Sequence, residues 1–150
     1  MSSTEGPSST PGPLVTNEEY EMLAAFRYAL RRFLSFSEEE ARTAGITPQQ
    51  YQALLMVRGS PGRDQLTISE LAERLKIQHH SAVGLVNRLV AQGLMVRRPG
   101  THDRRKVYAA LTSRGANLLE QLAAMHIDQL RRLWPDLQPA LERLTTGDES

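Results

Sequence analysis

The fold is decided by the stretch LTISELAERLKIQHHSAVGLVNRLVAQGLMVRRPGTHDRRKVYAAL, which runs from residue 66 to residue 111. Thr67 and Glu70 have the spacing of a capping box, in which each side chain accepts a hydrogen bond from the other residue's backbone amide. A short helix is therefore predicted to begin there. A second helix is predicted over residues 78–92, because valine and leucine recur there at helical spacing. Gly93 follows as the left-handed residue that ends many helices.

Two strands are predicted after this helix pair, over 94–98 and 106–111, with a turn at Pro99-Gly100-Thr101 between them. Two short helices joined tightly and followed by a hairpin are typical of a winged helix-turn-helix. In such a unit the second helix presents its N-terminal residues to the major groove of DNA, and the hairpin reaches an adjacent groove. The sequence therefore predicts a DNA-binding module over about residues 47–112.

Helices are also predicted on both sides of this module. Thr16-Asn17-Glu18-Glu19 is a capping box that opens a long helix, and Thr47 opens a shorter one with the same signal. After the hairpin, Thr112 is predicted to cap a long helix that ends at Pro135, with a last short helix beyond it. The fold class is therefore mainly α, a winged helix-turn-helix with flanking helices in the order α-α-(β)-α-α-β-β-α-α.

The outer helical segments, 17–45 and 113–145, carry apolar residues on more than one face. One apolar face packs a helix against its own chain, and a second face needs a partner. We therefore predict that these segments are dimerisation helices and that the chain is a homodimer. Residues 1–15, rich in Ser, Thr, Pro and Gly, are predicted to be a flexible tail, and residues 16–150 a single domain.

The net charge of +1 hides a strong segregation of charge. Residues 58–114 hold eleven Lys or Arg and four acids, a net +7, whereas the rest of the chain holds seven basic residues and thirteen acids, a net −6. A basic module inside an acidic chain is typical of nucleic-acid binding. A solvated basic surface explains the charge alone equally well.

The composition argues against several other classes of protein. The chain has no cysteine, which excludes disulfides, thiolate catalysis and cysteine metal sites. No apolar run reaches the roughly 18 residues of a membrane span, and no secretion signal is recognisable, so a cytoplasmic protein without a membrane partner is expected. No catalytic triad, phosphate-binding glycine loop or metal cluster is found, so we expect no enzyme, cofactor or metal site.

Residues at the start of the second helix of the module are predicted to reach base edges or phosphates. Arg88, later on that helix, either binds a phosphate or pairs with Asp103 and holds the wing. The basic residues of the hairpin are predicted to meet the DNA backbone or a groove, although for Arg97 and Arg98 a solvated strand face is an open alternative. The predicted DNA-binding residues are His79, His80, Ser81, Asn87, Arg88, Arg97, Arg98, Asp103, Arg104, Arg105 and Lys106.

These residues resemble the MarR family of regulators. The match runs through LTISELAERL at 66–75, LVNRL at 85–89 and QGLMVRR at 92–98, and continues through Asp103-Arg104-Arg105 to Leu111-Thr112-Ser113-Arg114-Gly115. The resemblance implies a homodimeric repressor of transcription, less often an activator, that binds a near-palindromic site on double-stranded DNA. It also implies that Arg105 lies at the wing tip and enters the minor groove. Asp103 would then orient the arginines.

Three positions depart from the family's pattern. Lys76 stands where a glycine is common, so it must adopt a left-handed backbone or another turn geometry. Gln78 replaces the usual acidic or hydroxyl cap at the start of the recognition helix. Gly84 stands where many members carry a basic residue. Either its missing side chain permits a close approach to DNA, or the position makes no contact.

The resemblance places an effector site where the DNA module meets the dimerisation helices. The residues expected there combine apolar bulk with two cations, which would suit a small aromatic acid or another lipophilic molecule, and ordinary core packing explains them equally well. They are Arg27, Arg31, Phe33, Phe36, Ile46, Tyr51 and Leu54. His126 is expected at an interface or on the surface. The alternative function is that of an architectural or effector-free DNA-binding protein.

Overall fold

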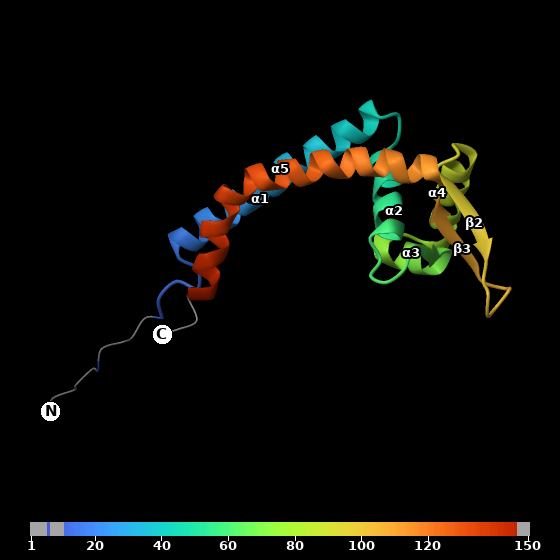
Figure 1. The fold of residues 1–150 in the computed structure, drawn as a ribbon. Coiled ribbons are helices and arrows are strands. Elements are labelled where there is room, and N and C mark those ends of the chain that lie inside the picture. Colours follow the sequence, from blue (N-terminus) through green and yellow to red (C-terminus); the bar gives the residue numbers. More distant parts are fainter. Residues whose placement is uncertain (1–5, 7–10, 147–150) are drawn as a thin grey trace.

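The computed structural model describes Gly6 and residues 11–146. Figure 1 shows a helical arm joined to a lobe of shorter elements. The helical arm consists of α1 (Asn17–Thr43) and α5 (Ser113–Thr146), which pack against each other. The elements of the lobe, called the winged lobe below, are α2 (Pro48–Arg58), β1 (Gln65–Thr67), α3 (Ile68–Leu75), α4 (His79–Ala91), β2 (Met95–Pro99) and β3 (Val107–Leu111).

The predicted helix starts are confirmed by their hydrogen bonds. Thr67 accepts a hydrogen bond from the amide of Glu70 at 3.1 Å, and Glu70 accepts one from the amide of Thr67 at 3.1 Å. Complete capping boxes also open α1 at Thr16 and α2 at Thr47. Each box satisfies two backbone amides that would otherwise lack partners, so the sequence sets the first residue of three helices locally.

The strands form one antiparallel sheet in the order β1-β3-β2. β3 is the central strand, with Leu66 of β1 and Arg97 of β2 both opposite Ala109. This arrangement ties the hairpin to the segment that enters α3, which agrees with the predicted order of elements. The wing therefore projects from a sheet that also fixes the first helix of the helix-turn-helix.

The hydrophobic core lies inside the winged lobe and at its junction with the arm. Apolar side chains from α2, α3, α4 and the sheet fill it, and α5 closes it from one side. The largest fully buried side chains are Leu54, Val57, Leu66, Leu71, Leu85, Val86, Leu89, Met95 and Leu122. These residues come from every element of the lobe except β3, which adds the buried Ala109, so the recognition helix is held against a rigid support.

The prediction that Pro135 ends the last long helix is wrong. α5 continues through Pro135 and Pro139 to Thr146, and Figure 1 shows it bending near its red C-terminal end. A proline removes one helical hydrogen bond and crowds the preceding turn, which bends a helix when packing still favours continuation. Leu133 before the proline is buried and Leu137 after it is half-buried, so the apolar face runs on past this point.

The predicted domain bounds lie partly outside the described residues, because the structure describes only Gly6 and residues 11–15 of the expected tail and nothing after Thr146. The division of the chain at residue 16 stays a prediction. Among the described helices, none is long and apolar enough to cross a membrane.

Candidate nucleic-acid interface

The turn between α3 and α4 is built on a left-handed lysine. Lys76 has φ 56° and ψ 44°, so the first of the two alternatives for this position is the correct one. A left-handed conformation costs a non-glycine residue about 1–2 kcal/mol. The amide of Lys76 donates to the carbonyl of Glu73 at 3.1 Å, and the amide of Ile77 donates to Ala72 at 3.0 Å. These bonds satisfy the end of α3 and turn the chain into α4.

The recognition helix α4 has a buried face and an exposed face. Ala82, Leu85, Val86 and Leu89 pack into the core. The exposed face carries the predicted DNA-binding residues of the helix, His79, His80, Ser81, Asn87 and Arg88. Gln78 caps the helix without any side-chain hydrogen bond, as its residue type predicts. The amides of the first turn of α4 therefore have no partner from their own cap.

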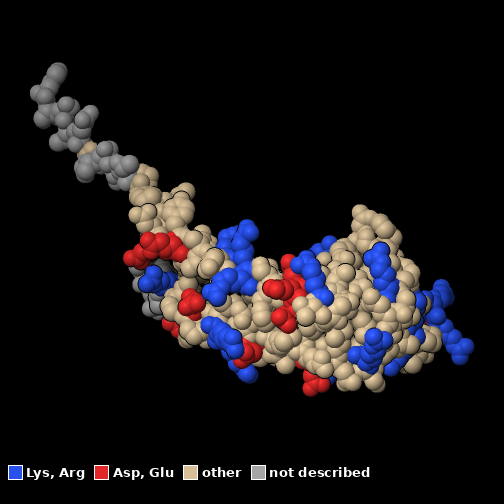
Figure 2. Space-filling view, turned by 90° about the horizontal axis from the view of Figure 1, so that it is seen from above, with Lys and Arg blue, Asp and Glu red and all other residues tan. Residues whose placement is uncertain are grey.

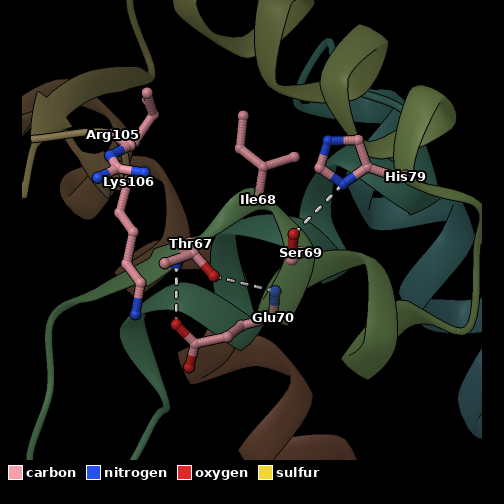
Figure 3. Close-up of a pocket in the computed structure, with 8 residues that line it drawn as sticks. Thr67, Ile68, Ser69, Glu70, His79, Arg105 and Lys106 are labelled. Atoms are coloured by element: carbon pink, nitrogen blue, oxygen red, sulfur yellow. Dashed lines mark hydrogen bonds between the residues drawn. The ribbon is translucent and has the colours of Figure 1, made fainter. Parts of the chain in front are cut away.

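A cleft separates the first turns of α3 and α4 from the base of the wing. It has a volume of about 520 Å³, and Figure 3 shows His79 on one side and Arg105 and Lys106 on the other. Ser69 Oγ lies 3.4 Å from His79 Nδ1 and joins the two helices at the rim. Sequence reasoning missed Ser69, because its neighbour in space is ten residues away along the chain. A basic cleft beside a helix start can hold a phosphate group.

The wing tip is shaped by Asp103. Its carboxylate accepts a hydrogen bond from the amide of Arg105 at 3.0 Å, and its Oδ1 lies 3.9 Å from Arg105 Nε. The ion pairs of the described residues do not join Arg88 to Asp103, so that alternative for Arg88 is wrong. The side chain of Arg105 is 96% exposed and projects from the turn. A guanidinium in this position can enter a groove of DNA.

The remaining basic residues of the hairpin point in different directions. Arg97 lies opposite Ala109 and Arg98 opposite Tyr108, and successive residues of a strand face opposite sides of the sheet. The structure therefore does not bring these two arginines together, although both are exposed. Arg104 and Lys106 are also exposed, on either side of Arg105.

The hairpin is locked to the end of the recognition helix by the start of α5. Thr112 Oγ1 donates to the carbonyl of Gly93 at 2.6 Å and accepts from the amide of Gly115 at 3.0 Å. Gly93 has φ 73°, the left-handed conformation predicted for it. A Cβ on Gly115 would overlap the carbonyl of Leu94. The Leu-Thr-x-x-Gly motif is thus a close joint between the winged lobe and the helical arm.

A second joint holds the start of α3. Arg63 donates two hydrogen bonds to the carboxylate of Glu70, one of them 2.9 Å long from Nη2 to Oε1. The hydrogen bond from Arg63 holds the pKa of Glu70 well below its ordinary 4.5, at about 2, with the bonds to Thr67 contributing. Arg63 was not identified from the sequence, because the residues between it and Glu70 carry no pattern that brings the two together.

The predicted effector residues are divided between a cluster of aromatic rings, the surface and the core. Phe33, Phe36 and Tyr51 surround His126, whereas Arg27 and Arg31 are exposed. At about 100° per residue, each of the two arginines lies more than 100° around α1 from both phenylalanines. The expectation that they would supply cations beside the aromatic rings is therefore wrong. Ile46 and Leu54 are buried core residues.

His126 is buried inside the chain, so of its two expected places, an interface or the surface, the surface is wrong. It is 4% exposed, and its Nδ1 lies 2.6 Å from the hydroxyl of Tyr51. Its Nε2 is buried and makes no hydrogen bond of normal geometry within the described residues. Burial lowers the pKa of His126 below its ordinary 6.5, and Glu40 and the backbone of Ser37 oppose this shift. A neutral imidazole therefore joins α5 to α2 and α1.

Charged residues are distributed differently over the winged lobe and the helical arm. Figure 2 shows Lys and Arg over the winged lobe, with few acids on this face, whereas acidic and basic residues alternate along the helical arm. All eleven predicted DNA-binding residues are exposed, and all lie on α4 or the hairpin. Within the described part of the chain, no three His, Cys, Asp or Glu side chains gather as a possible metal site.

Known proteins share this arrangement. The model of the MarR family matches residues 44–106. A protein of Thauera aromatica, named for the regulation of the hcr operon, is 32% identical over 105 residues, which are 69% of this chain and 61% of that relative. The transcriptional repressor NicR of Pseudomonas putida is 29% identical over 126 residues, 81% of this chain and 76% of the relative. This chain thus spans less than two thirds of the Thauera protein.

The same fold occurs in a MarR mutant of E. coli that was solved in complex with operator DNA. Its TM-score is 0.61 at 24% identity, and the match covers 89% of this chain and 97% of the E. coli chain. The fold and the wing define a winged helix-turn-helix protein. The resemblance to the MarR family is confirmed by the match of its model to residues 44–106 and by the relatives named as regulators of transcription.

Proposed function

We propose that this chain is a repressor of transcription that binds a near-palindromic DNA site as a homodimer. The observation that carries the proposal is the wing tip, where Asp103 forms the turn and leaves Arg105 almost fully exposed. A folded protein gains little stability from an arginine held in this way, whereas DNA offers it a groove of negative potential. Relatives named as regulators of transcription support the same function.

The side chains divide into two roles in this proposal. His80, Ser81 and Asn87 project from the recognition helix and can donate to or accept from base edges in the major groove. Arg88 and Lys106 are exposed cations that can neutralise phosphates, and Arg105 enters the minor groove beside them. Contacts of the first kind select a sequence, and those of the second kind position the protein.

The dimer is proposed from the helical arm. Aromatic and aliphatic side chains lie exposed on both of its helices, including Tyr20 at 61% and Trp134 at 52%. The exposed set on the arm is Tyr20, Leu23, Phe26, Tyr28, Leu30 and Leu34 on α1, with Met125, Ile127, Leu130, Trp134 and Leu144 on α5. Apolar surface of this extent on two adjacent helices fits a second copy of the same arm.

We also propose that a small lipophilic molecule relieves repression by binding where α1, α2 and α5 meet. The aromatic rings of Phe33, Phe36 and Tyr51 lie there, around the buried imidazole of His126. A ligand acts only through unequal affinity for two states of the protein. Here it would favour a dimer whose recognition helices are wrongly spaced for DNA.

The alternative function, an architectural or effector-free DNA-binding protein, predicts a different affinity pattern. Such a protein binds all sequences with similar affinity, whereas a repressor prefers its site by about 10³-fold or more. The helix α4 favours the repressor, because hydrogen-bonding side chains dominate its exposed face. Titration of the protein–DNA complex with lipophilic compounds separates the effector-responsive protein from an effector-free one.

The test of the proposed function compares Arg105→Ala with Arg131→Ala. Arg105 lies at the wing, and Arg131 is an exposed arginine of α5 far along the chain from the wing. Fluorescence anisotropy with a selected DNA duplex should show weaker binding for Arg105→Ala only. If Arg105 also meets a phosphate, the slope of log affinity against log salt should fall by about 0.9. Equal affinity of both folded variants and the wild type would overturn the assignment of Arg105.

A further inference from the structure

Gly84 is half-buried and lies near the middle of the side of the recognition helix that faces away from the core. With about 100° per residue, His80 and Arg88 lie one turn before and after it, about 40° to either side. Ser81 and Asn87 lie about 60° to either side of the same line. Four side chains able to hydrogen-bond therefore surround one position without a side chain, on the face opposite to the packed residues of α4.

The fold itself does not need a glycine at this position. Gly84 lies within α4 and is not among the glycines with positive φ, which are Gly45, Gly62 and Gly93. A Cβ built on Gly84 meets nothing within 4 Å, unlike one on Gly115, which would overlap the backbone. Glycine is the poorest helix former after proline. A local rule is broken here without any reason in the folded chain, which points to a functional reason.

We propose that Gly84 determines sequence specificity by forming a recess that accepts the C5-methyl group of a thymine. This inference rests on the proposed function. In the major groove the thymine methyl projects beyond the hydrogen-bonding edge of the base and is recognised by apolar contact. At Gly84 the methyl would meet the backbone of α4, while the flanking His80, Ser81 and Asn87 reach neighbouring bases and Arg88 reaches a phosphate. A phosphate is a poorer occupant, because the centre of the helix face points at the floor of the groove.

The experiment uses the full chain and a DNA site selected by the wild-type protein. Each thymine of the site is replaced in turn by deoxyuridine, which removes only the methyl group. The wild type should lose about fourfold in affinity at one thymine of each half-site, the worth of one buried methyl-sized group. Gly84→Ala should bind the original site at least about tenfold more weakly, within the range for one wrong base pair. It should show no further loss with deoxyuridine at that position.

Loss of folding cannot produce this result, because Gly84→Ala adds a better helix former in open space. Its melting temperature should rise by about 2–4 °C. Gln92→Ala, at the exposed C-cap of the same helix, is the matched control and should bind as the wild type does. Unchanged affinity of Gly84→Ala, or an equal effect of deoxyuridine on Gly84→Ala and wild type at every thymine, would overturn the inference. Failure of the wild type to select any site would instead overturn the proposed function, and this inference with it.

Discussion

Glu70→Gln tests how the start of α3 is held. The carboxylate of Glu70 accepts two hydrogen bonds from Arg63 and one from the amide of Thr67. Glutamine can keep the bond to Thr67, since Gln50 makes the same bond in the capping box of α2. The substitution therefore removes the ion pair and leaves the helix cap in place.

The expected magnitude follows from the pKa of Glu70. A shift from 4.5 to about 2 would correspond to about 3 kcal/mol at full weight. The side chain of Glu70 is 32% exposed, and solvent screening reduces this to about 1 kcal/mol. Because the pKa is depressed in the folded state, this stability is present above pH 4.5 and is lost as the pH falls toward 2.

Urea denaturation at a series of pH values measures the effect. Glu70→Gln should lower the free energy of unfolding by about 1 kcal/mol at pH 7, and the difference from wild type should shrink steadily below pH 4.5. Glu19→Gln is the control, because Glu19 makes the same capping bonds in α1 and has no arginine in the ion pairs of the described residues. A difference for Glu70→Gln that stays constant between pH 7 and pH 3 would refute the role of the ion pair.

Three further predictions concern the joints and the arm. Gly115→Ala should have an unfolding free energy at least about 2 kcal/mol lower than that of the wild type, because its Cβ would overlap the carbonyl of Leu94. Thermal denaturation measures this difference, and a stability equal to that of the wild type would contradict it. The free energy of unfolding of the wild type should fall as the pH drops below 6.5, because the buried His126 resists protonation. The unfolding free energy of His126→Phe should not change with pH in this range, and parallel curves for the two proteins would refute the role of His126. Leu130→Arg, on the exposed apolar face of α5, should give a folded monomer by light scattering, and an unchanged dimer would exclude this face from the interface.

Interactions between residues close together in the sequence predict most of the fold. The helix starts at Thr16, Thr47 and Thr67 depend on residues three positions apart, and Gly93 ends its helix through its own backbone. Such interactions are contained within one turn, so the sequence displays them directly. The wing turn at Asp103 is of the same kind, since the carboxylate bonds to an amide two residues on.

The errors arose where tertiary packing decides. Pro135 ends a helix by the local rule, but the buried Leu133 before it and half-buried Leu137 after it keep α5 continuous. Arg27 and Arg31 lie near Phe33 in the sequence, but the turn of α1 places them on another side of the helix. The burial of His126 depends on rings from α1 and α2, which no pattern around residue 126 reveals.

The eleven predicted DNA-binding residues show the same division between local and tertiary causes. Their exposure follows from the amphipathic pattern of α4 and from the polar turn of the wing, both of which are local. Which of them meets a base and which a phosphate depends on the partner duplex and on the spacing of two recognition helices. These assignments are predictions, and the variants described above test them.

We propose that two copies of the chain together recognise one particular DNA sequence, each through its own α4 and wing. Selection of bound fragments from a genomic DNA pool by the purified full chain, followed by sequencing, tests this claim most directly. We expect one enriched, near-palindromic motif whose half-site centres lie about one helical turn apart, roughly 34 Å. This motif should be preferred by about 10³-fold or more over unrelated DNA. Fragments recovered without any enriched motif would contradict it.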